Sequence, residues 1–526
     1  MGKKWFDNIG EFSIIQSHFP MPMRTTSNPG APRSPRRRES AAAGFAPALD
    51  TASPVPAVRQ LYLHLRDGIV GGVLRPGHRL PATRTAALEW GVSRGVITEA
   101  YEMLIAEGYA LGRHGSGTYV AAGLPALPIH GGNLRAAASA GGPRTVSVAA
   151  RLARRLETAF PAQIAFATGR VTHDARTANL LKRLAHRHLD YARDGYRDPQ
   201  GEPALREAVA AYLTASRGVC CTPAQIFITA GTQQAMDLAI RTLLTPGDTA
   251  LVEDPCYPPA RQALVLNGAR LVGIPVDDDG IRTAALDAYR GTPPALVYVT
   301  PSHQYPTGAA LPLARRLQLL AFAQRHGSWI IEDDYDSEFR YEGHSIASLQ
   351  GLDANGRVIY AGSFSKALLP GLRVGYLVVP DDLVAAFRAV RPIIDRFAPP
   401  LPQRVVADFL NEGYFPAHLR RLRESHRGAR DFLAECLAAR LAAHLVAPVP
   451  RQGVHLSAAG TGTWHDDRAL ARAALAAGVV VTPVSPMHLR APAVPRLLLG
   501  FSGLSEAETD QATRRLARVF EMHARG

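Results

Sequence analysis

Six short apolar runs, separated by stretches with helical periodicity, constrain the fold of this chain more than any other feature. They are QIFITAG, TALVED, ALVYVTP, SWIIEDDY, RVIYAGSFSK and RVGYLVV, all between residues 225 and 379. Apolar residues at consecutive positions are typical of strands that are buried on both faces. We therefore predict that residues 159–526 form a three-layer α/β domain.

The length and composition of the chain suit more than one folded domain. At 526 residues it exceeds an ordinary single domain, and 47% hydrophobic residues are enough for a substantial core. The formal net charge of +14 is compatible with an anionic partner. A basic composition that only keeps the chain soluble explains the same charge equally well.

The sequence shows no sign of a metal site, a leader or a membrane span. None of the cysteines has the spacing of a metal site. The N-terminus lacks the continuous apolar run of a signal peptide. No stretch of about twenty apolar residues occurs. We therefore expect a cytoplasmic protein with no bound metal and no membrane contact.

Two segments have compositions that do not suit a folded domain. Residues 1–50 mix Pro, Gly and Ser with a run of arginines, which predicts a disordered basic arm. We favour solvated arginines over the alternative, a contact with DNA phosphates. Residues 122–158 are rich in Ala, Gly, Pro and Arg and predict a linker.

Residues 55–121 have the element order of a winged helix-turn-helix. An amphipathic helix is followed by a short helix that Thr83 is placed to cap. Ser93 is placed to cap the next helix, predicted from Arg94 to Ala106. Two short strands then flank a glycine-rich tip. In this α+β head the second helix of the motif enters the major groove and the tip contacts the neighbouring backbone.

The side chains that would face DNA follow from this geometry. Arginine suits guanine edges, and Ser or Thr suits phosphates or base edges. The predicted contacts are Arg84, Ser93, Arg94, Thr98, His114 and Gly115. The alternative is a winged helix used only for protein contacts. Residues 71–120 closely resemble the GntR-type DNA-binding domain, and that resemblance implies a double-stranded DNA operator as partner.

A lysine flanked by serines marks the segment SFSKALLPGLRVGY at 363–376. A lysine amine can hold an aldehyde covalently, and serine hydroxyls with a guanidinium can share phosphate oxygens. TAGTQQAMDLAI opens a helix, whose first N–H groups favour an anion. The residues predicted to hold a phosphorylated aldehyde are Ser363, Ser365, Lys366, Arg373, Gly231, Thr232 and Gln233.

Three further residues narrow the ligand to pyridoxal 5′-phosphate. Asp333 and Tyr335 lie on one side of an extended backbone, where they suit the pyridine nitrogen and the 3′ oxygen. Tyr257 in EDPCYP suits an aromatic plate over the ring. Taken singly, each has an ordinary explanation, such as a surface lysine, a loop acid or a core aromatic. Their joint occurrence predicts the cofactor, with Lys366 as the Schiff-base amine.

About 350 residues of the chain resemble the fold-type I aminotransferases, and this resemblance implies a smaller C-terminal α+β part beside the three-layer α/β part. YRDPQGEPALR at 196–206 is similar to a segment whose tyrosine, here Tyr196, reaches the cofactor phosphate of the other subunit. The resemblance therefore implies a homodimer with shared sites. Together with the head, the whole chain looks like the MocR-type subfamily of GntR regulators. TPSHQYPTG, EDDYDSEFRY and SFSKALLPGLRVGY agree with that subfamily.

Two positions depart from the aminotransferase pattern. Tyr305 stands where these enzymes usually carry an asparagine that contacts the 3′ oxygen. Leu498 stands where they usually carry an arginine that clamps the substrate α-carboxylate, and Arg496 lies two residues earlier on the same face of a strand. Efficient turnover of α-amino acids is therefore not expected, although residual transaminase activity is compatible with the site.

We predict a transcriptional regulator that senses pyridoxal phosphate, an amine or an amino acid through an aldimine on Lys366. The first alternative is an active aminotransferase with an appended DNA-binding head. The second is a scaffold that binds no cofactor. The operator sequence, the effector and the sign of regulation are not readable from the sequence.

Overall fold

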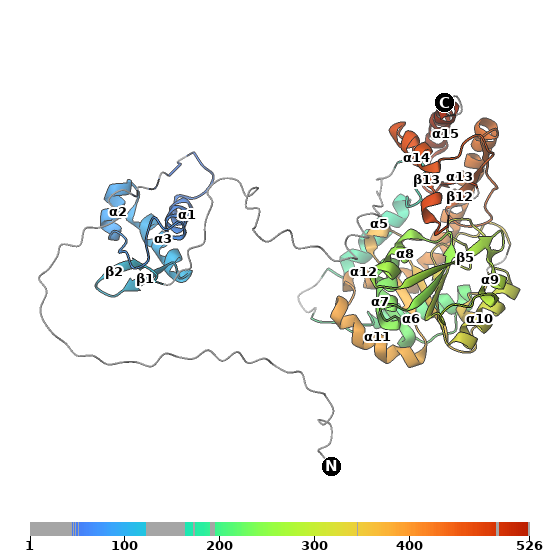
Figure 1. Cartoon of the computed structure of the whole chain (residues 1–526), viewed down its shortest axis with the longest axis horizontal. Helices are drawn as coiled ribbons and strands as arrows, with labels where there is room; N and C mark the ends of the chain where they lie inside the picture. The colour runs from blue at the N-terminus through green and yellow to red at the C-terminus, as the bar shows by residue number, and fades with distance from the viewer. Residues whose placement is uncertain are drawn as a thin grey trace, which may run out of the picture. The chain divides into compact units, whose positions relative to one another are not determined.

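The computed structural model describes residues 45, 47, 49–50, 52–122, 164–171, 174–189, 195–343, 346–490 and 494–523. The chain divides into two compact units, residues 1–144 and 145–526, and each is described by itself (Figure 1). Most of the arm predicted at 1–50 and of the linker predicted at 122–158 lies outside the described residues. No helix among the described residues is long and apolar enough to cross a membrane.

The smaller unit is a winged helix-turn-helix, as predicted. Its core includes Leu61 and Leu65 from the first helix and Ile97 and Leu104 from the third, all fully buried. The two strands pair antiparallel and form the wing. The elements are α1 (Ala57–Val70), α2 (Thr83–Trp90), α3 (Arg94–Ala106), β1 (Ala110–Arg113) and β2 (Gly117–Val120).

One of the two predicted helix caps in this unit is confirmed and the other is wrong. Ser93 caps α3, because its Oγ accepts a hydrogen bond from the Val96 N–H at 3.3 Å. Thr83 does not cap α2 but is its first residue, and Ala82 precedes it without a side-chain bond. The Thr83 hydroxyl instead accepts a hydrogen bond from Arg94 Nε at 3.3 Å, which ties the starts of α2 and α3 together.

The larger unit is built on an eight-stranded mixed sheet, and all six apolar runs contribute strands to it. The strand order is β3-β10-β9-β8-β7-β4-β5-β6. Strands β4, β5, β7, β8 and β9 run parallel, whereas β10 is antiparallel to both β3 and β9. The strands are β3 (Ile226–Thr229), β4 (Thr249–Asp254), β5 (Arg270–Asp277), β6 (Gly280–Ile281), β7 (Leu296–Val299), β8 (Trp329–Asp334), β9 (Val358–Ser363) and β10 (Gly375–Val378).

Helices cover both faces of this sheet, which confirms the three predicted layers. On β4, Val252 packs into a cluster with residues of α7, α8 and α11, such as Phe387. The adjacent Leu251 packs on the opposite face with residues of α10, such as Phe322. The covering helices are α7 (Thr232–Leu243), α8 (Pro258–Leu266), α10 (Leu313–His326) and α11 (Asp381–Ile394).

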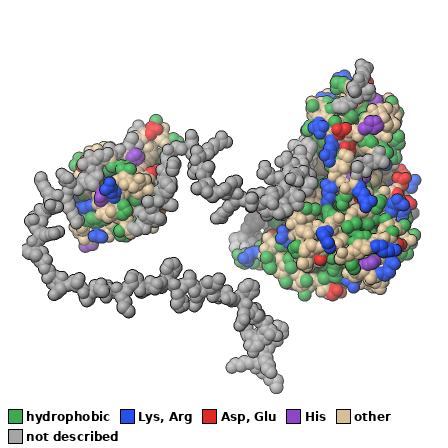
Figure 2. Space-filling model, in the orientation of Figure 1, with side chains coloured by type: hydrophobic (Ala, Val, Ile, Leu, Met, Phe, Trp, Pro, Cys, Tyr) green, Lys and Arg blue, Asp and Glu red, His purple; other side chains and the backbone are tan. Residues whose placement is uncertain are grey.

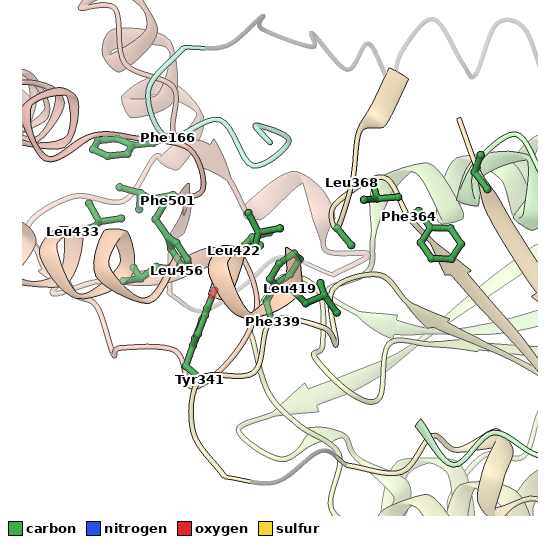
Figure 3. Close-up of a cluster of buried hydrophobic side chains, with 14 of the residues drawn as sticks. Phe166, Phe339, Tyr341, Phe364, Leu368, Leu419, Leu422, Leu433, Leu456 and Phe501 are labelled. Atoms are coloured by element: carbon green, nitrogen blue, oxygen red, sulfur yellow. The ribbon is translucent and has the colours of Figure 1, made fainter. Parts of the chain in front are cut away.

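The C-terminal part is a smaller antiparallel sheet of order β11-β12-β14-β13 with its own helices. Its core continues into the rest of the unit: Phe166, Phe339, Leu433, Leu456 and Phe501 belong to one buried cluster (Figure 3). The elements are β11 (Leu445–Val446), β12 (His455–Gly460), β13 (Thr482–Pro483), β14 (Arg496–Gly500), α13 (Tyr414–Leu441), α14 (Asp467–Ala476) and α15 (Glu506–His523). The unit also contains helices α5 (Ala175–Arg187), α6 (Pro203–Arg217), α9 (Thr283–Asp287) and α12 (Pro400–Asn411).

Candidate cofactor site and DNA-binding surface

Lys366 lies just after β9, where its side chain is half-buried. Its Nζ donates a hydrogen bond to the Thr168 carbonyl oxygen at 3.0 Å. Burial lowers the pKa of Lys366, and the negative charge of Asp336 opposes that shift without reversing it. A lowered pKa increases the fraction of neutral amine, which is the form that attacks an aldehyde.

Asp333, near the end of β8, is the clearest sign of a missing binding partner. Its side chain is only 2% exposed, and its Oδ2 accepts a hydrogen bond from the Tyr298 hydroxyl at 2.8 Å. Its Oδ1 is buried with no hydrogen-bond partner in the described part of the chain. Burial raises the pKa of Asp333 to about 7. A protonated pyridine nitrogen would supply the missing donor, so this residue fits the predicted cofactor.

Tyr298 is a site residue that the sequence did not reveal. It lies inside the apolar run of β7, where a tyrosine is easily interpreted as a hydrophobic core residue. The register places it opposite Ile331, two residues before Asp333, so both point to the same face of the sheet. Only the pairing of β7 with β8 could have shown that its hydroxyl supports the carboxylate.

Tyr257, Tyr305 and Tyr335, all singled out from the sequence, form one cluster of aromatic rings. The rings of Tyr257 and Tyr305 meet edge to face at 5.1 Å between centroids, and those of Tyr305 and Tyr335 do so at 5.9 Å. Tyr257 precedes α8 and is half-buried. Burial raises the pKa of Tyr257, and the charge of Asp333 raises it further. Burial also raises the pKa of Tyr305 to about 12, so all three present neutral rings and hydroxyls at neutral pH.

Two histidines and an aspartate that the sequence did not single out adjoin these tyrosines. His303 Nδ1 lies 2.9 and 3.0 Å from the carboxylate oxygens of Asp336, and the Tyr335 hydroxyl lies 3.0 Å from the same nitrogen. The His455 ring is 5.1 Å from that of His303 and nearly parallel to that of Tyr335. His303 and Asp336 are separated by 33 residues, so sequence spacing gave no signal for the pair.

The predicted phosphate-binding residues gather at one edge of the sheet. Gly231 precedes α7 with φ of 87°, and a Cβ built there would lie 3.0–3.1 Å from the Arg373 guanidinium. Arg373 Nη2 donates to the Ala230 carbonyl at 2.5 Å. Ser363 and Ser365 are linked by a 2.8 Å hydrogen bond between their hydroxyls. The first N–H groups of α7, at Thr232 and Gln233, have no intrahelical acceptor, so this edge suits an anion.

Tyr196 does not reach these residues within its own chain. Its side chain is 81% exposed, and its ring contacts Phe397 and lies 5.0 Å beneath the Arg396 guanidinium. Its predicted contact with a cofactor in a second subunit stays a prediction.

Leu498, at the position where aminotransferases carry the carboxylate-binding arginine, is buried among apolar side chains. Leu498 on β14 is fully buried and packs with Val484 and Met487, and Tyr305 packs against this group. Arg496 lies on the same face of β14, two residues away, and lines a neighbouring cleft. The structure thus leaves no guanidinium at residue 498.

The predicted DNA contacts in the smaller unit are mostly exposed. Arg84, Arg94, His114 and Gly115 are exposed, and Gly115 has φ of 71° in the wing turn. Lys and Arg side chains are visible on the surface of this unit and of the larger one (Figure 2).

Two of the predicted contacts already have partners inside α3. Ser93 caps the helix, and the Thr98 hydroxyl donates to the Arg94 carbonyl at 2.9 Å. Two exposed arginines were missed: Arg79, packed against Gly117 of the wing, and Arg113, stacked 4.9 Å above the Tyr119 ring. Arg113 lies in wing strand β1, and Arg79 lies before α2 and forms an isolated bridge with Tyr119 of β2, so only Arg113 could have been found from its place in a predicted wing strand.

Comparison with known proteins agrees with both units. Residues 161–516 match the family Aminotransferase class I and II, and residues 57–120 match Bacterial regulatory proteins, gntR family. The chain is 38% identical over 476 residues to a probable rhizopine catabolism regulatory protein MocR of Rhizobium meliloti, covering 90% of this chain and 95% of that protein. The chain belongs to the MocR-type regulators of the GntR family.

This MocR-type regulator is also 36% identical over 382 residues to the HTH-type transcriptional regulator TauR of Rhodobacter capsulatus, covering 70% of this chain and 77% of that protein. Among solved structures it resembles LysN, an α-aminoadipate aminotransferase of Thermus thermophilus complexed with N-(5′-phosphopyridoxyl)-L-leucine. That match has a TM-score of 0.64 and 28% identity, and it covers 71% of this chain and 97% of LysN.

These findings confirm the predicted fold class and the predicted class of function. The chain is a transcriptional regulator of the MocR type, with a GntR-type head and a fold-type I aminotransferase-like domain. The head implies DNA binding, and the aminotransferase fold implies pyridoxal phosphate.

Proposed function

We propose that this MocR-type regulator binds pyridoxal phosphate covalently through Lys366 and that its occupancy controls DNA binding by the head. The Oδ1 of buried Asp333, which has no hydrogen-bond donor among the described residues, carries the proposal, because a buried carboxylate oxygen without a donor is costly unless a ligand supplies one. The cofactor, when bound, supplies an electron sink and an aldehyde that exchanges between amines.

Each predicted residue has a defined task around that cofactor. Asp333, held by Tyr298, keeps the proton on the pyridine nitrogen. Lys366 supplies the amine, and burial lowers its pKa, which increases the neutral fraction that can attack an aldehyde. Tyr257 covers the ring, and Tyr335, fixed by His303, is positioned toward the 3′ oxygen.

The phosphate has its own set of donors. The hydroxyls and N–H groups of Ser363, Ser365, Gly231, Thr232 and Gln233, together with the Arg373 guanidinium, form the anion-binding edge.

The effector is proposed to be an amine, an amino acid or pyridoxal phosphate itself. Any such ligand can control DNA binding only if it binds one arrangement of the heads better than another. The apolar surroundings of Leu498 favour a ligand that does not depend on an α-carboxylate clamp at this position.

The proposal is tested by titrating the purified full-length protein with pyridoxal phosphate and candidate amines while cofactor absorbance and DNA affinity are followed together. We expect the two signals to change over the same range of ligand concentration. Lys366→Ala should lose the absorbance of the covalently bound cofactor and keep a folded protein. A Lys366→Ala protein with full covalent absorbance would contradict the assignment of this lysine.

We further propose a homodimer in which Tyr196 of one chain contacts the cofactor phosphate held by the other. The exposed ring of Tyr196 supports this arrangement, since 81% exposure is unusual for so large an aromatic side chain. Mixing a Lys366→Ala chain with a Tyr196→Ala chain gives heterodimers in which both substitutions fall on one site. Recovery of one intact site per heterodimer supports sharing, and an absence of recovery contradicts it.

A second candidate function is an aminotransferase activity. The lowered pKa of Lys366 and the hydrogen bond between Tyr298 and Asp333 favour it, because both residues are needed for amine exchange and proton movement. Leu498 opposes it, because leucine cannot pair with a substrate carboxylate. Single-turnover formation of the pyridoxamine form with an α-amino acid, at ordinary enzymatic rates, would favour the enzyme over the pure regulator.

A further inference from the structure

One face of the small C-terminal sheet is polar and adjoins the tyrosine cluster. Because side chains alternate along a strand, His455 and Ser457 of β12 point to this face, whereas Leu456 and Ala458 are fully buried in the core on the other side. Ser457 pairs directly with Leu498 of β14. The face therefore includes the position where an aminotransferase would carry its clamp.

A cleft of about 770 Å³ lies over this face. His455, Ser457, Arg340 and Arg496 line it, and the segment 307–310 closes one side. Its volume is within the range of sites that bind small molecules. His455 is common to the cleft and to the tyrosine cluster, so the two spaces are neighbours.

Three residues that line the cleft each carry a buried polar atom with no hydrogen-bond partner within the described residues. The atoms are His455 Nε2, Ser457 Oγ and Arg340 Nε. His455 is 3% exposed and Ser457 is 8% exposed. Arg340 is held in place by a 2.9 Å hydrogen bond from its Nη1 to Gln452 Oε1. Unpartnered buried polar atoms are rare, and three in one cleft indicate groups that a ligand satisfies.

The charges of the cleft favour an anion. Arg340 and Arg496 form no ion pair with a carboxylate of the described chain. Of the acids in the cleft, Asp254 accepts two backbone N–H groups and Asp277 is ion-paired with an arginine, which leaves Asp278 exposed at the rim. Burial lowers the pKa of His455, so its imidazole is neutral and acts only as a hydrogen-bonding group.

The remaining wall of the cleft is apolar and exposed. Val446, Val449 and Val494 all line it, although they are 59%, 48% and 45% exposed. Exposed valines that share a cleft with unpaired guanidinium groups suit a ligand with an apolar body and an anionic end.

We propose that this cleft binds a small carboxylic acid with an apolar body. Its carboxylate accepts hydrogen bonds from Arg340 Nε and Ser457 Oγ and is attracted by Arg496, and its body packs on Val446, Val449 and Val494. The site needs no bond to Lys366 and thus goes beyond the proposed function.

The test uses calorimetric titration of the full-length protein with benzoate and hexanoate. Benzamide is the uncharged match to benzoate, and inorganic sulfate tests for attraction by charge alone. We expect saturable binding of at least one acid, with benzamide at least about tenfold weaker because a charge-assisted hydrogen bond is lost. No saturable binding of either acid, equal affinity for benzoate and benzamide, or sulfate bound as tightly as both acids would overturn the proposal.

Variants locate the site and separate it from the cofactor. Ser457→Ala removes a hydroxyl that has no hydrogen-bond partner among the described residues, so the stability of the variant should be unchanged while acid affinity falls about tenfold. Arg496→Gln should also weaken the acid.

Ser328→Ala is the matched control, because it also removes a buried serine hydroxyl, but one outside the cleft that has a partner. Ser328 directly precedes β8, and its Oγ donates a hydrogen bond to the Pro294 carbonyl oxygen at 2.6 Å. Ser328→Ala should lower stability and leave acid affinity unchanged. Lys366→Ala should retain acid binding even when covalent cofactor is lost. Unchanged affinity in both Ser457→Ala and Arg496→Gln, or loss of acid binding in Lys366→Ala, would contradict the site.

Discussion

Replacing Asp333 by asparagine should weaken cofactor binding and yet stabilise the cofactor-free protein at alkaline pH. Burial raises the pKa of Asp333 from 3.8 to about 7. The folded chain therefore holds this proton more tightly than the unfolded chain, and the free energy of unfolding falls as pH rises from about 4 to about 7. At about 1.4 kcal/mol for each pH unit in that window, ionised Asp333 costs the folded protein about 4 kcal/mol above pH 7.

Asparagine removes this cost but adds a smaller one. Its carbonyl oxygen can still accept from the Tyr298 hydroxyl, whereas its NH₂ group is left buried without an acceptor, at about 1–3 kcal/mol. The net expectation at pH 8 is a gain of about 1–3 kcal/mol in the free energy of unfolding without cofactor, and a smaller gain or a loss at pH 5. Cofactor affinity should fall by about tenfold to a hundredfold, because the charged hydrogen bond to the pyridine nitrogen is lost.

Urea unfolding of the cofactor-free protein at pH 5 and pH 8 measures the first effect, and titration with pyridoxal phosphate measures the second. Asp334→Asn is the control on the same strand, because Asp334 is ion-paired with buried Arg217 at 2.8 Å. It should destabilise at both pH values, by about 3–5 kcal/mol. The reasoning is refuted if Asp333→Asn is less stable than the wild type at pH 8 without cofactor, or if it binds the cofactor equally well.

Three other substitutions test the remaining assignments. Leu498→Arg should speed reaction with α-amino acids in single-turnover absorbance measurements, at a stability cost of several kcal/mol for a charge in an apolar cluster; no gain in rate would remove the clamp explanation. Arg94→Ala should weaken operator binding about tenfold to a hundredfold in a mobility-shift or anisotropy assay without changing cofactor absorbance, whereas Arg66→Ala on α1 should not; equal affinities would contradict the groove placement. Tyr196→Ala should weaken cofactor binding in the dimer only, and an equal loss in a dilute monomer would argue against a shared site.

The main fold was predictable because it follows from local properties of the sequence. Continuous apolar runs specify strands buried on both faces, and the residues after such strands in parallel sheets meet at one edge. Lys366, Asp333 and the start of α7 were found from short motifs that lie in or directly after these strands.

The rest depends on contacts between residues far apart in the sequence. Tyr298 supports Asp333 only because β7 pairs with β8 in a particular register. His303 and His455 meet through the packing of the small sheet, although 152 positions separate them. The misplaced cap at Thr83 has a local cause: its hydroxyl bonds to Arg94, so the helix begins one residue earlier than a threonine cap would set it.

The reversed strand β10 decides where an arginine can meet the phosphate-binding edge. Gly375, its first residue, pairs with both Thr229 at the end of β3 and Ser363 at the end of β9. An antiparallel strand begins where its neighbours end. Arg373, two residues before Gly375, therefore lies next to the loops that follow β3 and β9. Had β10 run parallel, Arg373 would enter the sheet at the opposite edge, about 10 Å or more away. The direction of β10 thus brings Gly231 and Arg373, more than 130 residues apart in the sequence, into a single anion site. Insertions in the connecting chain should leave that site intact as long as the direction of β10 is kept.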